Sequence, residues 1–180
     1  MSLSIRPATE DDATAVLEIY APIVRDTVIS FETEVPSIDE MRRRIRETLQ
    51  MYPWLVAEED GEILGYGYAG PLRSRAAYRW SAEVSMYIRP NARMKGVGTA
   101  IGMKLTEILV RMGIVNLFGG TTLPNPASDG IYRASGFEQV GVWRNAGYKL
   151  GRWYDVGWYQ RHLREPEGDP DELIPYGELP

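Results

Sequence analysis

Residues 80–105 read WSAEVSMYIRPNARMKGVGTAIGMKL, and this stretch decides the fold. Its first part, residues 80–88, alternates apolar and polar residues, which is the period-two pattern of a β-strand. Glu83, Ser85 and Tyr87 therefore lie on one face of that strand. The sequence then becomes glycine-rich and basic, and apolar residues follow at helical spacing. The stretch thus predicts a strand, a glycine-rich loop and a helix in direct succession.

The glycine-rich loop is typical of a binding site for an anion. Gly96 and Gly98 allow the backbone to approach a ligand closely, and the start of the following helix offers unpaired N–H groups. Arg93 and Lys95 add positive charge, so a pyrophosphate group fits here, although an ordinary turn with solvated basic residues explains the segment equally well. A Walker phosphate loop has a different spacing, and a dinucleotide-binding fingerprint lacks its acidic residue in the strand predicted at residues 115–122. Both alternatives are therefore disfavoured.

The remaining pattern mixes strands and helices without strict alternation. Two strands, residues 54–58 and 63–69, flank an Asp-Gly pair suited to a tight hairpin turn. Ser37 begins a capping box that predicts a helix start, and the arginines of that helix, within residues 42–46, are interpreted as a solvated face. The sequence therefore predicts an α/β protein with a mixed sheet and helices on both faces. Further strands are expected at residues 3–7, 115–122, 137–144 and 153–162, and further helices at residues 13–24, 97–112 and 125–135.

Length and composition limit the classes of protein. The chain has 180 residues, of which 44% are hydrophobic and 25% charged, as in a single globular domain. Cysteine is absent and His162 is the only histidine, which excludes disulfides and a cysteine nucleophile, and no metal site is predicted. No apolar run is long enough to cross a bilayer and the start of the chain does not resemble a signal peptide, so we expect a cytoplasmic protein without a membrane partner.

The formal net charge of −5 is unevenly distributed along the chain. Residues 165–180 hold six acidic residues and no Lys or Arg, which leaves residues 1–164 with 20 basic and 19 acidic residues and a net charge of +1. Prolines are interleaved with the acidic residues. We therefore expect one domain over residues 1–164 and an extended acidic tail over residues 165–180, and we expect deletion of residues 167–180 to leave the chemistry intact.

Several motifs resemble the GNAT superfamily of N-acetyltransferases. Residues 93–98, with the pattern Arg-x-x-Gly-x-Gly, look like its acyl-coenzyme A pyrophosphate motif, and residues 125–137, which begin Asn-Pro-Ala-Ser and end Ser-Gly-Phe, are similar to a later motif. Residues 75–83 and 146–157 more narrowly resemble the phosphinothricin and methionine sulfoximine N-acetyltransferase family. The resemblance spans residues 3–164. It implies a mostly antiparallel sheet of about seven strands, acetyl-CoA as co-substrate and a homodimer.

The resemblance also implies a position for the coenzyme. The backbone of the strand end would pair with the pantetheine arm, the glycine-rich loop would surround the pyrophosphate, and the later motif would contact the coenzyme near the thioester. The residues assigned to these contacts are Met86, Tyr87 and Ile88 in the strand, Arg93, Met94, Lys95, Gly96, Val97, Gly98 and Thr99 in the loop, and Asn125 and Ser128 in the later motif.

Two residues are predicted to carry the catalysis. An ammonium group must lose a proton before it attacks a thioester, and Glu83 is the candidate base because an unpaired carboxylate is costly within an apolar strand. The alternative is that Glu83 only pairs with an arginine of residues 73–79. By resemblance, Tyr132 is the candidate proton donor to the thiolate; alternatively it only packs on the core, and the best-known phosphinothricin enzymes have a histidine there. The absence of cysteine agrees with direct attack in a ternary complex.

The acceptor is expected to carry an anionic group. Arg73 and Arg75 follow a turn and could pair with a carboxylate or phosphinate, although solvated loop arginines are the ordinary alternative. The irregular segment at residues 29–34 carries an aromatic side chain that could cover the acceptor. The residues assigned to acceptor binding are Phe31, Arg73, Arg75, Glu83, Ser85 and Tyr87.

Together these features predict an acetyl-CoA-dependent N-acetyltransferase for the α-amine of a small amino-acid-like acceptor. Phosphinothricin, methionine sulfoximine and methionine sulfone are the leading substrates. Two alternatives stay open: a transferase for another amine, such as a polyamine, an aminoglycoside or a protein N-terminus, and a non-catalytic acyl-CoA sensor. The six aromatic residues between Trp143 and Tyr159 are attributed to packing or to a homodimer interface, because an acidic chain with few lysines argues against nucleic-acid binding.

Overall fold

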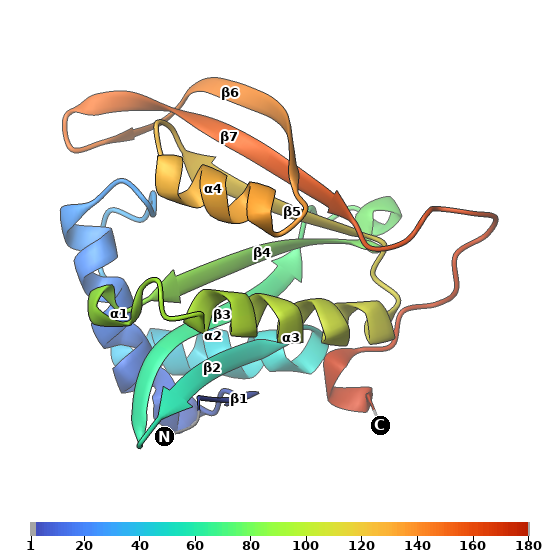
Figure 1. Ribbon diagram of the computed structural model, residues 1–180, viewed down its shortest axis with the longest axis horizontal. Helices are drawn as coiled ribbons and strands as arrows, with labels where there is room; N and C mark the ends of the chain where they lie inside the picture. Colours follow the sequence, from blue (N-terminus) through green and yellow to red (C-terminus); the bar gives the residue numbers. More distant parts are fainter. Residues whose placement is uncertain (1–2, 180) are drawn as a thin grey trace.

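Residues 3–179, which the computed structural model describes, form one sheet of seven strands (Figure 1). The strands are β1 (Ser4–Pro7), β2 (Trp54–Glu59), β3 (Glu62–Pro71), β4 (Ser81–Ile88), β5 (Asn116–Thr122), β6 (Glu138–Lys149) and β7 (Arg152–His162). Their order in the sheet is β1-β2-β3-β4-β5-β7-β6, and every neighbouring pair is antiparallel except β4 with β5. The predicted mixed, mostly antiparallel sheet is confirmed. Met1, Ser2 and Pro180 of the predicted ranges lie outside the described residues.

Helices cover both faces of this sheet, as predicted (Figure 1). They are α1 (Ala13–Asp26), α2 (Ile38–Met51), α3 (Val97–Met112) and α4 (Pro126–Ala134), with short 3₁₀ turns at Glu10–Asp12, Ala76–Tyr78, Pro90–Ala92 and Tyr176–Glu178. Leu55 and Ala57 of β2 belong to the core cluster that contains α3, whereas Trp54 and Val56 belong to the cluster that contains α1 and α2. Because successive side chains of β2 point to opposite faces of the sheet, this one strand contributes to two hydrophobic cores. Within residues 3–179, no helix combines the length and apolarity needed to cross a membrane.

Local signals in the sequence set the ends of two helices. Ser37 Oγ accepts a hydrogen bond from the backbone N–H of Glu40 at 3.1 Å, so the predicted cap of α2 is confirmed. Gly96 and Gly113 flank α3 with φ values of 80° and 91°, in the left-handed region where a side chain is strained. These two glycines define where the glycine-rich loop ends and where the chain leaves α3.

The parallel pairing of β4 with β5 is short. Only Ser81–Glu83 pairs with Asn116–Phe118, although both strands run on. Further along, β4 remains paired with β3 and β5 remains paired with β7, so the two strands separate while each stays in the sheet. The edge of β4 at residues 84–88 consequently has no strand partner on the β5 side among the described residues.

The hairpin of β6 and β7 is longer than predicted. Its first strand is expected at residues 137–144, but β6 continues to Lys149. Between Trp143 and Gly147 the pairing register shifts, because two extra residues on β6 are accommodated in an irregularity before pairing with β7 resumes. The segment 146–149, which carries part of the family resemblance, therefore lies in a paired strand.

The acidic tail folds back onto the body of the molecule. Leu173, Tyr176 and Leu179 pack against the core cluster around α3. The indole Nε1 of Trp80 donates a hydrogen bond to the carbonyl oxygen of Asp171 at 2.9 Å. The expectation of an extended appendage is therefore wrong for this part of the tail, because Leu173, Tyr176 and Leu179 pack against apolar partners. In the sequence these residues stand among acidic residues and prolines, so they form no recognisable apolar pattern.

We predict that deleting residues 167–180 destabilises the fold. Exposing the apolar surface covered by Leu173, Tyr176 and Leu179 costs about 2–3 kcal/mol, which lowers the Tm of a chain of this size by about 5–10 °C. Thermal unfolding followed by circular dichroism measures the change. The double variant Glu165→Gln/Glu167→Gln, which removes charge but keeps the apolar contacts, is the control and should unfold near the wild-type Tm. A truncated chain with the wild-type Tm would contradict the prediction.

Candidate active site

The carboxylate of Glu83 lies where β4 and β5 separate. Glu83 pairs with Phe118 at the last position of the parallel ladder, and its side chain is half-buried. Burial raises the pKa of Glu83 above its usual range, and the positive charge of Arg73 opposes that rise. The ion pairs of residues 3–179 include none at Glu83, and Arg79 instead pairs with Glu172 at 3.0 Å. Glu83 is thus a partly desolvated carboxylate without a bound cation.

Arg73 is held by two indole rings. Its guanidinium carbon lies 5.4 Å from the ring centre of Trp143 and 5.7 Å from that of Trp158, within the range of cation–π attraction. Its Nη1 also donates a hydrogen bond to the carbonyl oxygen of Leu72 at 2.7 Å. Both arginines are exposed, but Arg75, which precedes a 3₁₀ turn, has no ion pair or ring contact among the described residues. The structure therefore fixes Arg73 and leaves Arg75 in solvent.

Tyrosine side chains continue the sheet face that carries Glu83. Tyr68 of β3 lies opposite Ser85 of β4; burial raises the pKa of Tyr68, and the nearby Ser85 hydroxyl opposes this rise. The ring centre of Tyr87 lies 5.1 Å from that of Tyr20 on α1, and burial raises the pKa of Tyr87 well above its usual range. Of the predicted acceptor residues on this strand, Ser85 is next to Glu83, whereas Tyr87 packs against α1.

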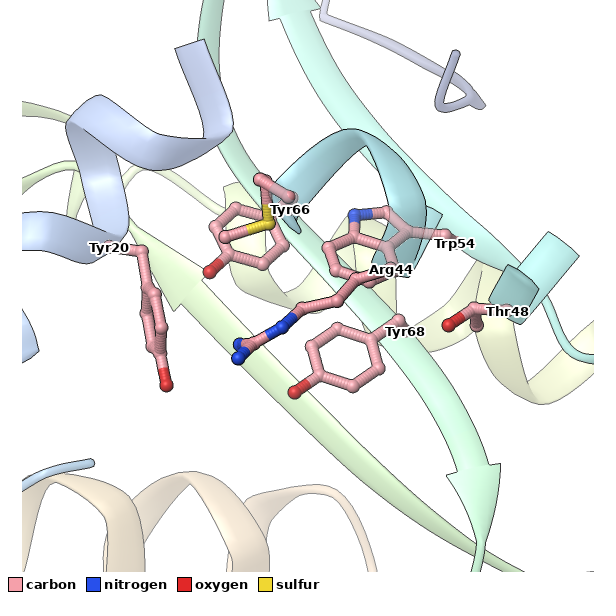
Figure 2. Close-up of a pocket in the computed structure, with 7 residues that line it drawn as sticks. Tyr20, Arg44, Thr48, Trp54, Tyr66 and Tyr68 are labelled. Atoms are coloured by element: carbon pink, nitrogen blue, oxygen red, sulfur yellow. The ribbon is translucent and has the colours of Figure 1, made fainter. Parts of the chain in front are cut away.

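A cavity of about 180 Å³ lies on the same face of the sheet, beneath α2 (Figure 2). The rings of Trp54 and Tyr68 stack in it with their centres 4.4 Å apart. Figure 2 shows the hydroxyl groups of Tyr20 and Tyr68 and the guanidinium group of Arg44 at the same end of the cavity. These three polar groups are therefore gathered on one side of the cavity, whereas Thr48 lies on the other. The cavity is lined by Tyr20, Met41, Arg44, Thr48, Trp54, Tyr66 and Tyr68.

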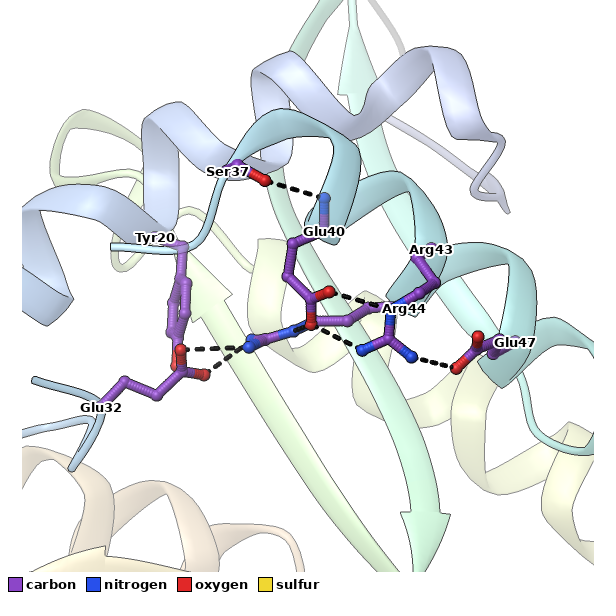
Figure 3. A network of polar contacts seen from close by, with 7 residues as sticks. All are labelled: Tyr20, Glu32, Ser37, Glu40, Arg43, Arg44 and Glu47. Carbon is purple, nitrogen blue, oxygen red and sulfur yellow. Dashed lines mark hydrogen bonds and ion pairs between the residues drawn. The ribbon is translucent and has the colours of Figure 1, made fainter. Parts of the chain in front are cut away.

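Arg44 ties α2 to the loop between α1 and α2 (Figure 3). Its guanidinium group contacts the carboxylate of Glu32 at 2.7 Å, and its Nε contacts Glu40 at 2.8 Å. The hydroxyl of Tyr20 donates a second hydrogen bond to Glu32 at 2.9 Å. The interpretation of Arg44 as part of a solvated face is therefore wrong, because Arg44 is bound to the carboxylate of Glu32. This partner is twelve residues away in the sequence, so the helix pattern does not indicate it.

The β6–β7 hairpin holds the other side of the same loop. The side chain of Lys149 is only 6% exposed, and its Nζ donates a hydrogen bond to the carbonyl oxygen of Ser30 at 2.7 Å. Burial lowers the pKa of Lys149, and the negative charge of Glu32 opposes this. Phe31 packs against Gly147, where its ring leaves no room for a Cβ atom. The predicted acceptor-covering residue is thus clamped between α1, α2 and the hairpin.

Tyr132 of α4 lies across the separated strands from Glu83. Its ring stacks on Tyr159 at 4.5 Å, and its hydroxyl donates a long hydrogen bond of 3.5 Å to the carbonyl oxygen of Gly120. A Cβ atom at Gly119 would collide with the same ring. Burial raises the pKa of Tyr132 to about 12, and the negative charge of Glu83 adds to the rise. The two predicted catalytic residues are therefore within electrostatic reach of each other.

Asn125 and Ser128 form the start of α4. The side-chain oxygen of Asn125 accepts a hydrogen bond from the backbone N–H of Ser128 at 3.1 Å, and its nitrogen donates one to Thr121 Oγ1 at 3.1 Å. The hydroxyl of Tyr159 donates to Asp129 at 2.8 Å. These bonds fix α4, and with it Tyr132, to β5 and β7.

The glycine-rich loop meets β4 at the start of α3. A Cβ atom at Gly98 would lie 3.3 Å from Sδ of Met86, so the lack of a side chain lets the loop close on the strand. Val97 is buried in the core and anchors the first turn of the helix. The free N–H groups of that turn therefore lie beside the unpaired edge of β4. The loop side chains that are exposed are those of Arg93, Met94, Lys95 and Thr99.

Comparison with known proteins agrees with this architecture. Residues 5–158 match the family model described as an acetyltransferase (GNAT) domain. The chain belongs to the GNAT acetyltransferase family. It is 41% identical over 165 residues to a phosphinothricin N-acetyltransferase of Alcaligenes faecalis, a match that covers 89% of this chain and 82% of that protein. It is 34% identical over 177 residues to an L-methionine sulfoximine/L-methionine sulfone acetyltransferase of Pseudomonas aeruginosa, covering 97% of this chain and 100% of that protein.

A solved structure extends the similarity to three dimensions. The GNAT superfamily phosphinothricin acetyltransferase from Sinorhizobium meliloti in complex with AcCoA superimposes with a TM-score of 0.91 at 34% identity, over the full length of both chains. The family resemblance predicted from the sequence motifs is therefore confirmed.

In this GNAT domain, sequence reasoning missed three residues that shape the site. Tyr68 could have been found, because the predicted hairpin places β3 beside the strand that carries Glu83. Gly119 and Lys149 could not, since their roles depend on contacts with Tyr132 and with the α1–α2 loop that no local pattern indicates.

We predict that Glu83→Gln stabilises the folded protein above the pKa of the carboxyl group. Burial disfavours the charged form, so the penalty is absent below the usual pKa of 4.5, grows as pH rises through the raised pKa, and is full above it. The Tm of the variant should therefore exceed that of the wild type at pH 8 and approach it near pH 4. Glu138→Gln, at an exposed position in β6, is the control. A variant less stable than the wild type at pH 8 would contradict the assignment.

Proposed function

We propose that this GNAT domain transfers acetyl from acetyl-CoA to the α-amine of a small amino-acid-like acceptor: phosphinothricin, methionine sulfoximine or methionine sulfone. The observation that carries the proposal is Glu83, a half-buried carboxylate with a raised pKa at the separation of β4 and β5, within electrostatic reach of Arg73 and Tyr132. The names of relatives that match nearly the whole chain support these acceptors.

Acetyl-CoA is proposed to lie between the separated strands. The unpaired edge of β4 at Met86, Tyr87 and Ile88 offers backbone groups to the pantetheine arm. Residues 93–99 and the start of α3 offer N–H groups and positive charge to the pyrophosphate, with Asn125 and Ser128 near the thioester. A structural neighbour in complex with AcCoA supports this co-substrate. Among residues 3–179, no group of three or more His, Asp or Glu side chains is placed to hold a metal ion.

Glu83 is proposed to act as the base, directly or through a water molecule. It takes a proton from the acceptor ammonium, and the amine nitrogen then attacks the thioester carbonyl. As the C–S bond breaks and the thiolate leaves, the nitrogen loses its second proton, which replaces the proton that Tyr132 gives to the thiolate. Tyr132 is the proposed donor of the proton that the thiolate gains, because a pKa of about 12 keeps its phenol protonated at neutral pH. The chain contains no cysteine that could form an acetyl-enzyme, so attack is direct, in a ternary complex.

Charge and shape at the acceptor position favour an amino acid over a polyamine. Arg73, fixed by Trp143 and Trp158, attracts a carboxylate or phosphinate and repels a polycation. Phe31, held by the clamped loop, is proposed to cover the acceptor, and Arg75 to contribute a second positive charge from solvent. A non-catalytic acyl-CoA sensor needs neither this arginine nor a desolvated carboxylate.

A second copy of the chain is the proposed protein partner. The β6–β7 hairpin exposes several apolar side chains, and β6 is an edge strand whose outer side has no partner in the described chain. Such a surface in a soluble enzyme is typical of an interface, and a two-fold axis would pair it with itself. A cytoplasmic location and the lack of nucleic-acid and membrane partners stay predictions. The surface consists of Val140, Val142, Trp143, Tyr148, Leu150 and Trp153.

A thiol-release assay with acetyl-CoA and a panel of amines tests the activity. We expect turnover with phosphinothricin, methionine sulfoximine and methionine sulfone, and none with polyamines. Because proton removal by a placed base contributes about 100-fold or more, Glu83→Gln should lower kcat by that factor while acetyl-CoA binding measured by calorimetry is unchanged. Binding of acetyl-CoA without turnover of any amine would favour the sensor, and near-wild-type kcat in Glu83→Gln would remove Glu83 as the base.

Light scattering after size exclusion tests the proposed homodimer. We expect the wild type at twice the mass of one chain and Trp153→Glu at the mass of one chain, because Trp153 is 60% exposed in the single chain and a charge there cannot be buried unpaired. Met103→Glu is the matched control, since Met103 is 70% exposed and lies on α3 rather than on the hairpin. A monomeric wild type, or the same effect from Met103→Glu, would contradict the proposed interface.

A further inference from the structure

Three glycines in β3 have different surroundings. A Cβ atom at Gly65 would lie 3.0 Å from the carbonyl oxygen of Tyr87, and one at Gly67 would lie 2.7 Å from the side chain of Ile101. Packing therefore requires glycine at both positions. A Cβ atom at Gly70, by contrast, would meet nothing within 4 Å.

Backbone geometry does not explain Gly70 either. Its φ lies outside the left-handed region that favours glycine. It also lies within a regular ladder, since β3 pairs with β4 without a register shift from Gly65 to Pro71. Glycine within a strand is destabilising and commonly marks a place where a ligand approaches the backbone closely. Neither packing nor backbone conformation therefore explains why residue 70 is a glycine.

The residue directly opposite Gly70 is Glu83. Paired residues of an antiparallel ladder share a face, so the open space at Gly70 lies immediately beside the Glu83 carboxylate. The next pair along this face is Tyr68 with Ser85, and the Tyr68 ring is fixed by stacking on Trp54. The open space at Gly70 is thus bounded on one side by the fixed ring of Tyr68 and on another by the half-buried carboxylate of Glu83.

We propose that Gly70 is a specificity-determining residue whose missing side chain leaves room for the α-carbon and the first side-chain atoms of the acceptor. This inference rests on the proposed function, in which the acceptor amine is held at Glu83. A bound amino acid with its amine at Glu83 has to place its carbon skeleton within a few ångströms of that carboxylate, and Gly70 is the adjacent position that would otherwise carry a Cβ atom. The acceptors that fit are α-amino acids with slender, unbranched side chains.

The variants Gly70→Ala and Gly70→Val test this inference. Both residues are accepted by an extended backbone, and valine favours strands. Because one or two methyl groups in a binding space change discrimination by about tenfold or more, acceptor KM should rise about tenfold in Gly70→Ala and further in Gly70→Val. The KM for acetyl-CoA should stay at the wild-type value and the Tm should be equal to or above it, because Gly70 is costly in a strand and a Cβ atom there meets nothing within 4 Å. The rise in KM should be larger for methionine sulfone than for the smallest amine that the wild type accepts. Gly141→Ala in β6 is the matched control, since a Cβ atom there also meets nothing within 4 Å and β6 is three strands away from β4.

Each outcome decides the inference. Unchanged acceptor KM and unchanged ranking of acceptors in Gly70→Val would overturn it while leaving the proposed function in place. A parallel rise in the KM for acetyl-CoA, or an equal effect from Gly141→Ala, would also overturn it, because the change would then be a general disturbance. A wild type that acetylates no amine would overturn both the proposed function and the inference.

Discussion

The short parallel ladder between β4 and β5 is the constraint on which the site depends. The ladder ends at Glu83 and Phe118, and beyond it the two strands diverge, while β4 stays paired with β3 as far as Ile88 and β5 stays paired with β7 as far as Thr122. The divergence leaves backbone groups of β4 unpaired, admits the start of α3 against Met86, and places Glu83 where water is partly excluded. The proposed coenzyme edge, anion site and base therefore all depend on one feature of the sheet.

Features that depend on neighbours in the sequence could be predicted. The alternation around Glu83 predicts its strand face, and Ser37 and the loop glycines predict where helices begin. Arg44 shows why other features could not. An arginine among arginines on an amphipathic helix has the same pattern whether it is solvated or bound to a carboxylate twelve residues away. The prediction for the tail was wrong for a similar reason, since its apolar side chains are too sparse to form a pattern. Only their contacts near α3 show that they belong to the core.

The α1–α2 loop is ordered by charge on one side and by shape on the other. Glu32 is held by Arg44 and Tyr20, while Ser30 accepts from the buried Lys149 and Phe31 lies against Gly147. A buried ammonium group is costly unless it is well bonded, so the hairpin and the loop favour a single relative position. The hairpin that exposes the proposed dimer surface is thus the element that fixes Phe31. Two contacts, Lys149 with Ser30 and Gly147 with Phe31, therefore join this hairpin to the residue proposed to cover the acceptor.

The glycines of this site, which lack a side chain, are as informative about its shape as its polar residues. Gly98 lets the loop reach Met86, Gly119 makes room for the Tyr132 ring, and Gly147 makes room for Phe31, so each of these glycines is explained by a neighbour inside the protein. Gly70 has no such neighbour, yet it lies opposite the only carboxylate at the separated strands. A strand position that costs stability and serves no internal contact is best explained by a contact with a molecule that comes from outside. On the proposed coenzyme side the glycines have explanations within the protein: Gly98 faces Met86, Gly119 faces the Tyr132 ring, and Gly96 has a φ of 80° at which a side chain is strained.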